Sequence, residues 1–339
     1  MSNPLVSIVV PVYNGSNYID TFFSCMAKQS FGDYEVIVVD DGSKDDSYEK
    51  SLLYSEKDAR INVYKKENGG PGSARNYGID KASGDYIVFF DIDDEFSESV
   101  LEENAGIALN GEIDVVMWNF TMVILGTEKR YYRQIGVSCS SDRNEFFHSF
   151  LISTLDNEMF NPPWNKMIKR QLLIDNNIQF HTEYHLYEDI LFSYEVCKKA
   201  SSFAINDKSY YTYLIKSEGS LLTKYHPECF DAIHAIYKAA LSYGDSFEEN
   251  TRQISRFKEQ FIYLTKGYIK QICINKSMSI SEKKEALARI GNNPDFRAIS
   301  LEKDKGMRRL PARFMMRHGL YGSLVLFYNI LDSYRKNNG

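Results

Sequence analysis

"LVSIVVPVYN", residues 5–14, decides the fold of the first part of the chain. Its apolar residues are nearly continuous and mostly β-branched, which is typical of a strand buried on both faces of a parallel sheet. An amphipathic helix is expected next, with one apolar face formed by Ile19, Phe22, Phe23 and Met26. Asn14 or Ser16 is the predicted cap of this helix. A second buried strand, "YEVIVVDDGS" at 34–43, completes a strand–helix–strand unit.

The alternation continues beyond this unit. The pattern predicts a helix at about 45–59, a strand at "INVYKK" (61–66), a helix at 71–83 with Pro71 at its start, a strand at "DYIVFF" (85–90), a helix at 97–109, and one or two strands in "EIDVVMWNFTMVI" (112–124). Alternating strands and helices give an open α/β sheet. In such sheets, ligands bind at the carboxyl ends of the strands.

Three predicted strands end in polar residues, in "PVYN" (11–14), "VDDGS" (39–43) and "FFDIDD" (89–94), and we expect these ends to meet at one edge of the sheet. Asp91 and Asp93 form a D-x-D, whose carboxylate oxygens suit Mg²⁺ or Mn²⁺. The alternative is that Asp94 or Ser97 caps the next helix. Capping explains one acid, but not the four acids among residues 91–95.

Composition excludes several classes of protein. The chain has 339 residues, enough for two or three domains, and its net charge of −6 argues against nucleic-acid binding over the whole surface. It has neither a Walker A motif nor a G-x-G-x-x-G after the first strand. Its five cysteines form no C-x-x-C pair, which fits a reducing compartment without a zinc site. No signal peptide is seen and the apolar runs are too short to span a bilayer, so a cytoplasmic location is expected.

Four motifs carry a resemblance to a known family. They are "SIVVPVYNGSNYI" (7–19), "VIVVDDGSKDDS" (36–47), "NGGPGSARNYGI" (68–79) and "YIVFFDIDD" (86–94). In this order they resemble the nucleotide-sugar-binding half of family 2 glycosyltransferases, which have the Rossmann-like GT-A fold. "PPWNKMIKRQLL" (162–173) and "HLYEDILFSYEV" (185–196) resemble the acceptor half more weakly. The resemblance implies a nucleotide-sugar-binding part at 1–120, an acceptor part at 121–225 and a helical region at 226–339.

The resemblance also implies roles for the strand ends. It places the nucleoside against Pro11, Val12, Tyr13 and Asn14, and an acid on the uracil or ribose, with Asp40 the first choice and Asp41 the second. An Asp-Gly turn is the alternative reason for these two acids. Near the nucleotide it places Gly70, Arg75 and Asn76. For Arg75, an ordinary surface position remains equally open.

The D-x-D stretch, Asp91, Ile92 and Asp93, corresponds to the metal-binding site of the family. The resemblance implies that Asp93 contacts the metal and the diphosphate, while Asp91 lies nearer the ribose or the sugar. A divalent ion, Mn²⁺ or Mg²⁺, is therefore the positive charge expected among these clustered acids.

The acceptor half supplies the expected base. The resemblance makes Asp189 the general base and Glu188 its neighbour, and places Trp164 near the acceptor sugar, with a core position as the alternative for this tryptophan. "KSEGSLLTK" (216–224) resembles a loop that closes over the diphosphate, with Ser217 and Ser220 as donor contacts. Many relatives have an arginine before the Gly-Ser pair of this loop. Here Lys216 or Lys224 is the candidate cation.

The function implied is transfer of one sugar, with inversion, from a UDP-sugar to a glycan or polymer acceptor, as in synthesis of surface polysaccharide, teichoic acid or glycoconjugates. The Q-x-x-R-W motif of processive synthases is absent. A Mg²⁺-dependent sugar nucleotidyltransferase is an alternative, although it usually has a glycine-rich, basic N-terminal loop. A non-catalytic scaffold is another alternative, but it predicts loss of the carboxylates that are present here.

The last stretch of the chain is basic and amphipathic. From residue 226 onward the apolar spacing predicts packed helices. The final segment contains Arg308, Arg309, Arg313, Arg317, Arg335 and Lys336 against one acid, Asp332. Such a segment binds an anionic membrane surface, or docks on the domain or on another subunit as a homo-oligomer contact, and the sequence leaves these alternatives open.

Overall fold

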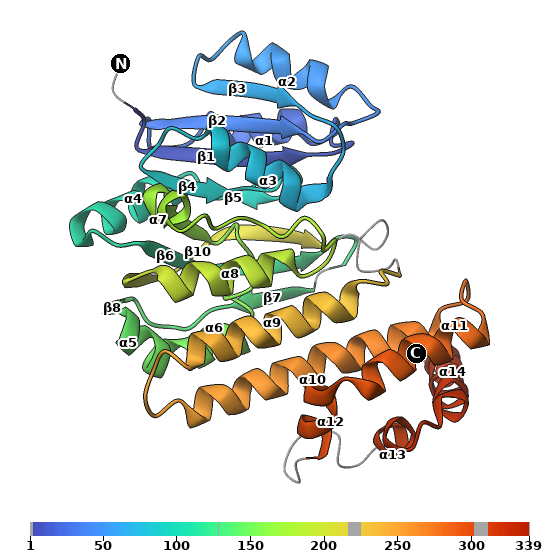
Figure 1. The fold of residues 1–339 in the computed structure, drawn as a ribbon. Helices are drawn as coiled ribbons and strands as arrows, with labels where there is room; N and C mark the ends of the chain where they lie inside the picture. The colour runs from blue at the N-terminus through green and yellow to red at the C-terminus, as the bar shows by residue number, and fades with distance from the viewer. Residues whose placement is uncertain (1–2, 128, 216–224, 302–310, 339) are drawn as a thin grey trace. The chain divides into compact units, whose positions relative to one another are not determined.

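The computed structural model describes residues 3–127, 129–215, 225–301 and 311–338. The chain divides into two compact units, residues 1–220 and 221–339. The first unit contains the sheet and the second is helical (Figure 1). The finer division of the first unit at residue 120 stays an interpretation.

The first unit is built on one mixed sheet. Its strands are β1 Val6–Val12, β2 Tyr34–Asp40, β3 Ile61–Lys65, β4 Tyr86–Phe89, β5 Glu95–Phe96, β6 Val115–Ile124, β7 Arg130–Arg133, β8 Cys139–Asp142, β9 Lys166–Lys169 and β10 Ser202–Ile215. The order is β3-β2-β1-β4-β9-β6-β10-β5, with β7 on β6 and β8 on β10. Strands β3, β2, β1 and β4 are parallel, and β9 runs antiparallel between β4 and β6. The predicted α/β sheet is confirmed.

Helices cover both faces of this sheet (Figure 1). Those of the first unit are α1 Ile19–Met26, α2 Ser47–Ser55, α3 Gly70–Lys81, α4 Val100–Gly111, α5 Arg143–Glu145, the π-helical turn η1 Phe146–Phe150, α6 Leu151–Asp156, α7 Arg170–Asp175 and α8 Glu188–Lys199. Helices α1 and α4 share a core with Ile8 and Trp118. On the other face α8 packs against β4, where the rings of Phe89 and Phe192 meet edge to face at 5.8 Å.

The predicted helix caps are wrong. Tyr18 precedes α1, and no side chain caps that helix. Asn14 and Ser16 bind the loop after β2 instead: Asn14 Oδ1 accepts from the Lys44 N–H at 2.8 Å, and the Ser16 N–H donates to Asp45 at 3.1 Å. These local polar groups thus stabilise a contact between two strand ends, which sequence spacing alone does not reveal.

The start of α4 differs from the prediction in the same way. The helix begins at Val100 after Ser99, and neither Asp94 nor Ser97 caps it. Asp94 is turned toward β10, where it accepts a hydrogen bond from the Leu214 N–H at 2.9 Å. The acid that a capping argument explained therefore has a tertiary partner.

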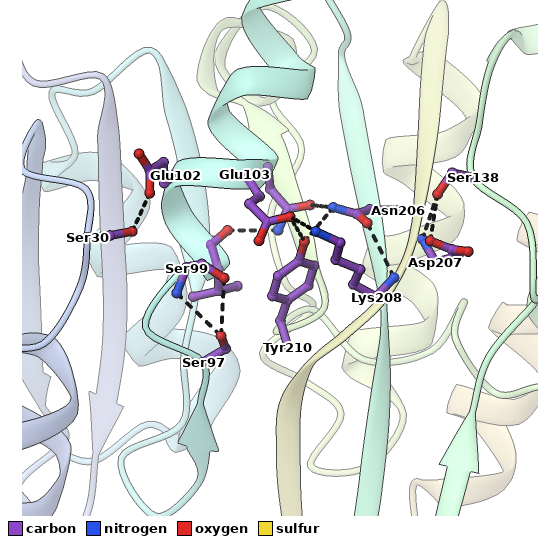
Figure 2. A network of polar contacts seen from close by, with 12 residues as sticks. Ser30, Ser97, Ser99, Glu102, Glu103, Ser138, Asn206, Asp207, Lys208 and Tyr210 are labelled. Atoms are coloured by element: carbon purple, nitrogen blue, oxygen red, sulfur yellow. Dashed lines mark hydrogen bonds and ion pairs between the residues drawn. The ribbon is translucent and has the colours of Figure 1, made fainter.

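A polar network joins α4 to β10 where the strand register is irregular, at residues 206–211 (Figure 2). Glu103 accepts hydrogen bonds from Lys208 at 2.5 Å and from the Tyr210 hydroxyl at 2.7 Å. Asn206 Nδ2 donates to that hydroxyl at 2.9 Å. The bonds from Lys208 and Tyr210 lower the pKa of Glu103 to about 2. The network thus fixes this bulged part of β10 on α4.

The second unit consists of helices in its described residues. They are α9 Cys229–Gly244, α10 Thr251–Ile274, α11 Ile280–Asn292, α12 Pro294–Leu301, α13 Pro311–Arg317 and α14 Tyr321–Asn338. A capping box at Ser279 and Glu282 starts α11. Among the described residues, no helix combines the length and the apolar character needed to cross a membrane.

Gly78 controls how closely α3 approaches β1, and this gives a test of the fold. A Cβ atom at Gly78 would lie 2.2 Å from Val9 Cγ1, whereas no atom of the described residues lies within 4 Å of one at Gly106 of α4. We predict that Gly78→Ala destabilises the protein by about 1–3 kcal/mol. The matched change Gly106→Ala should stabilise it by about 0.4–1 kcal/mol. Urea unfolding measures both, and a Gly78→Ala variant as stable as wild type would contradict the packing described.

Candidate active site

The carboxyl ends of β1, β2 and β4 lie side by side. Val12 is in register with Asp40, and Val9 with Phe89. The Asp41 N–H donates to the Val12 carbonyl at 2.8 Å. The polar residues that follow these strands are therefore at one edge of the sheet, as the parallel arrangement predicts.

The two acids at the end of β2 have different surroundings. Asp41 accepts hydrogen bonds from the backbone N–H groups of Gly69 at 3.0 Å and Gly70 at 2.7 Å. It also forms an ion pair with Lys66, whose Nζ lies 2.7 Å from Asp41 Oδ1. Asp41 thus holds the glycine loop at the start of α3. Gly70 has a φ of +86°, a conformation that favours glycine.

Asp40 is fully buried, and only one of its oxygens is used. Its Oδ1 accepts from the Ser43 N–H at 3.1 Å, while Oδ2 has no hydrogen-bond partner among the described residues. An unpaired buried carboxylate oxygen costs free energy. A ligand that donates a hydrogen bond here would remove that cost, so Asp40 stays the candidate for contact with a nucleoside.

The turn after β1 leaves one aromatic ring available. Pro11 is half-buried, Val12 is buried and Tyr13 is 49% exposed. Ile92, from the D-x-D stretch, packs against Gly15, which follows the turn. A Cβ atom added to Gly15 would lie 3.1 Å from Ile92 Cγ2. The turn and the D-x-D stretch are therefore in contact.

Arg75 is the resident positive charge among the acids. Its Nη2 lies 2.9 Å from Asp91 Oδ1, and its Nη1 lies 3.5 Å from Glu188 Oε1. The residue is 6% exposed, and its guanidinium lies over the Phe180 ring, 5.4 Å from the centroid. The alternative of a surface position for Arg75 is wrong. Instead it joins the acids after β4 to the start of α8.

Asn76 positions the segment that leads to α8. Its Nδ2 donates to the Phe180 carbonyl at 2.8 Å, and its Oδ1 accepts from the Phe180 N–H at 2.7 Å. Both functions of this amide are used within the protein. Its expected contact with the nucleotide stays a prediction.

Glu188 and Asp189 lie in the first turn of α8, where the helix dipole favours acids. Burial, together with the adjacent Asp189 carboxylate, raises the pKa of Glu188 to about 7, while Arg75 acts in the opposite direction. Burial also raises the pKa of Asp189, and the Ile190 N–H, which donates to Oδ1 at 2.8 Å, opposes this rise. A carboxylate with a raised pKa is a better proton acceptor than an ordinary aspartate.

Lys166 is a buried cation on the β9 side of this site. Four oxygens surround its Nζ and share its N–H groups: the carbonyls of Met159 at 3.2 Å, Phe160 at 3.0 Å and Pro162 at 2.5 Å, and Asn165 Oδ1 at 2.9 Å. Burial lowers the pKa of Lys166 to about 7, while Cys197 and Asp189 act in the opposite direction. Sequence reasoning missed this residue, although it lies within the "PPWNK" motif.

Trp164 belongs to a buried aromatic layer. It is 6% exposed and stacks on Tyr211 at a centroid distance of 4.3 Å. Tyr213 stacks nearby at 5.7 Å and Phe120 meets the indole edge to face at 4.6 Å. This packing favours the core position for Trp164, and its contact with an acceptor sugar stays a prediction.

Asp94 is a second residue that sequence reasoning missed as part of the site. It is 2% exposed, and its Oδ2 accepts from the Tyr211 hydroxyl at 2.8 Å. Burial and the nearby Asp91 and Asp93 carboxylates raise its pKa well above the usual value. Ser217, Ser220, Lys216 and Lys224 lie outside the described residues.

Comparisons with known proteins identify the family of this chain. Residues 7–176 match the model of the family described as "Glycosyl transferase family 2". The putative glycosyltransferase EpsH of Bacillus subtilis is 29% identical over 262 residues, covering 76% of this chain and 75% of EpsH. The poly(ribitol-phosphate) beta-N-acetylglucosaminyltransferase TarS of Staphylococcus aureus is 28% identical over 254 residues, covering 73% of this chain and 42% of TarS.

Solved structures have the same fold. Residues 1–349 of S. aureus TarS, in complex with UDP-GlcNAc, superpose with a TM-score of 0.73 at 22% identity, over 98% of this chain and 92% of that one. A mannosyltransferase from Pyrobaculum calidifontis, in complex with GDP-Man and Mn²⁺, gives a TM-score of 0.53 at 14% identity, over 98% of this chain and 88% of that one. The fold is thus GT-A, and the chain belongs to glycosyl transferase family 2.

Proposed function

We propose that this enzyme transfers one sugar, with inversion, from a UDP-sugar to a glycan or polymer acceptor. The observation that carries the proposal is the position of Arg75, which joins Asp91 of the D-x-D to Glu188, the neighbour of Asp189. The acids expected at the donor and the proposed base therefore lie around one guanidinium. The UDP-GlcNAc complex of TarS supports a UDP-sugar as the donor class.

The residues of the chain divide the work of the reaction. Tyr13 stacks on the base, and the free oxygen of Asp40 accepts a hydrogen bond from the uracil or the ribose. Asp189 takes the proton of the acceptor hydroxyl, whose oxygen attacks the anomeric carbon from the face opposite the diphosphate. The bond between that carbon and the diphosphate oxygen breaks, and UDP leaves. The base must be ionised to accept a proton, and burial raises the pKa of Asp189 above the ordinary value of 3.8. Activity should therefore be lost, as the pH is lowered, at a pH higher than 3.8.

A divalent ion fits the acids of this edge, although the protein supplies few ligands for it. Asp93 and Asp91 offer the oxygen donors that Mg²⁺ and Mn²⁺ prefer. No group of three His, Cys, Asp or Glu residues suited to a metal occurs in the described parts of the chain. Asp93 would be the main protein ligand, because Asp91 is paired with Arg75. The ion would stabilise negative charge on the departing diphosphate.

The donor and the base can be tested with one set of variants. We expect slow, Mn²⁺-dependent hydrolysis of one sugar in a panel of UDP-sugars, and its loss on chelation. Asp189→Asn should still bind UDP, but its turnover in transfer to the acceptor should fall by about 10²–10⁴-fold. The control is Asp80→Asn, a change at an exposed acid of α3, which should leave turnover unchanged. If no UDP-sugar binds or reacts with any metal, the proposed donor class is wrong.

We extend the proposal to contact between the helical tail and an anionic membrane surface. Leu326, Ile330 and Tyr334 are spaced four residues apart on α14 and are 63%, 60% and 67% exposed. Phe314 of α13 is 60% exposed. Residues 311–338 contain five basic residues, namely Arg313, Arg317, Arg335, Lys336 and the weakly basic His318, against the single acid Asp332. Two copies of this basic segment would repel each other, whereas an anionic bilayer attracts it.

Vesicle sedimentation of the whole protein tests this contact. We expect binding to phosphatidylglycerol vesicles, little binding to phosphatidylcholine vesicles, and loss of binding in Leu326→Gln/Ile330→Gln. The matched control is Leu53→Gln/Leu109→Gln, which removes two leucines that are each 53% exposed in the first unit. Failure to bind anionic vesicles would refute the proposal. A loss of oligomers in the α14 variant, measured by light scattering, would instead identify a second copy as the partner.

A further inference from the structure

The hydroxyl group of Tyr211 connects β10 to the D-x-D turn. It accepts a hydrogen bond from the Asp91 N–H at 3.1 Å and donates one to Asp94 Oδ2 at 2.8 Å. The other oxygen of Asp94 accepts from the Leu214 N–H at 2.9 Å. One hydroxyl and one carboxylate thus link the stretch 91–94 to two points on the same strand.

The bond between Tyr211 and Asp94 is buried, and the bonds to the Asp91 and Leu214 N–H groups are partly buried. Tyr211 is 1% exposed and Asp94 2% exposed. The Tyr211 ring stacks on Trp164 and lies at an angle to Phe90, 5.7 Å between centroids, so a phenylalanine would fill the same space. The hydroxyl adds a polar group that is costly to bury unless both of its bonds are made. Packing therefore accounts for the ring but not for the hydroxyl.

The backbone and the side chain of Asp91 are held separately. Tyr211 binds the N–H, and Arg75 binds the carboxylate at 2.9 Å. The Phe90 N–H bonds the Val9 carbonyl and the Asp94 N–H bonds the Asp91 carbonyl, so the bond to Tyr211 is the restraint on the N–H between them, next to the carboxylates of the D-x-D turn. The geometry of the donor acids thus depends on a residue 120 positions further along the chain.

We propose that Tyr211 and Asp94 are positioning residues for the D-x-D turn. The hydroxyl of Tyr211, oriented by Asp94, fixes the backbone of Asp91 so that Asp91 and Asp93 face the diphosphate of the donor. Asp94 acts through Tyr211 and β10 and does not bind the metal or the nucleotide. This inference rests on the proposed function, because it assigns a support to the same donor site.

Tyr210 provides a matched control in the same strand. Its hydroxyl also makes two hydrogen bonds, to Glu103 at 2.7 Å and from Asn206 at 2.9 Å, but these lie in the network against α4 (Figure 2). Tyr210 is 4% exposed. Removing either hydroxyl therefore costs one buried and one partly buried hydrogen bond, and only the change at Tyr211 affects the D-x-D turn.

The test is titration of UDP in the presence of Mn²⁺ on the full chain. We expect Tyr211→Phe and Tyr210→Phe to lower the thermal unfolding midpoint similarly. Tyr211→Phe alone should weaken UDP binding, by about five- to tenfold, which corresponds to one lost hydrogen bond. In transfer assays it should raise the KM for the donor more than it lowers kcat. Equal UDP affinity in wild type and in folded Tyr211→Phe would overturn the inference.

Asp94→Asn separates positioning from ligation. In Asp94→Asn the amide oxygen accepts from the Leu214 N–H and the amide nitrogen donates to the Tyr211 hydroxyl, which still accepts from the Asp91 N–H. The hydrogen of that hydroxyl loses its acceptor, so we expect lower stability although the bond to Asp91 is kept. We therefore expect Asp94→Asn to keep UDP affinity within about threefold of wild type and to leave the Mn²⁺ concentration for half-saturation unchanged, while Asp94→Ala behaves like Tyr211→Phe. A large rise in the Mn²⁺ requirement of Asp94→Asn would make Asp94 a ligand and refute its positioning role. If the wild-type protein does not bind UDP at all, it is the proposed function that is wrong, and not the positioning role of Tyr211 and Asp94.

Discussion

The buried guanidinium of Arg75 is the interaction on which the rest of the site depends. It is shared between Asp91 and Glu188, at 2.9 and 3.5 Å. Removing one partner of such a group typically costs about 3–5 kcal/mol, because a buried charge remains without compensation. The two acids are far apart in the sequence, so this one side chain links the end of β4 to the start of α8.

Several contacts of α3 hold the Arg75 side chain in place. Gly78 lets the helix approach Val9 of β1. Asn76 makes two hydrogen bonds to the backbone of Phe180, whose ring lies under the guanidinium. At the start of the helix, Asp41 binds the N–H of Gly70. These contacts attach α3 to the sheet, to the loop after β2 and to the segment before α8, so Arg75 has little freedom to leave its two acids.

The sequence was informative where burial dictates a pattern and uninformative where tertiary contacts assign a role. Strands buried on both faces give continuous apolar runs, so the sheet and the meeting of its carboxyl ends could be predicted. Asp40 and Asp41 occupy adjacent positions in one turn, and only the return of the glycine loop at 69–70 shows which acid is used internally. Asp94 has its partners on β10, so a local capping argument could not find them. Trp164 in its motif gives no indication of the aromatic layer that buries it.

The acids at this edge of the sheet outnumber the cations described beside them, so Arg75 does not balance their charge alone. Asp91, Asp93, Asp94, Glu188 and Asp189 are acids of the site, and Arg75 and Lys166 are the cations described beside them. Burial is the main cause that raises the pKa of Asp94 and that of Glu188, and neighbouring carboxylates raise both further, while Arg75 opposes the rise at Glu188 without reversing it. A nucleoside diphosphate adds further negative charge, and like charges at close range repel strongly in a buried site. Under the proposed function the donor would therefore bind together with a cation, and the carboxylates of Asp91 and Asp93 would supply oxygen ligands for it.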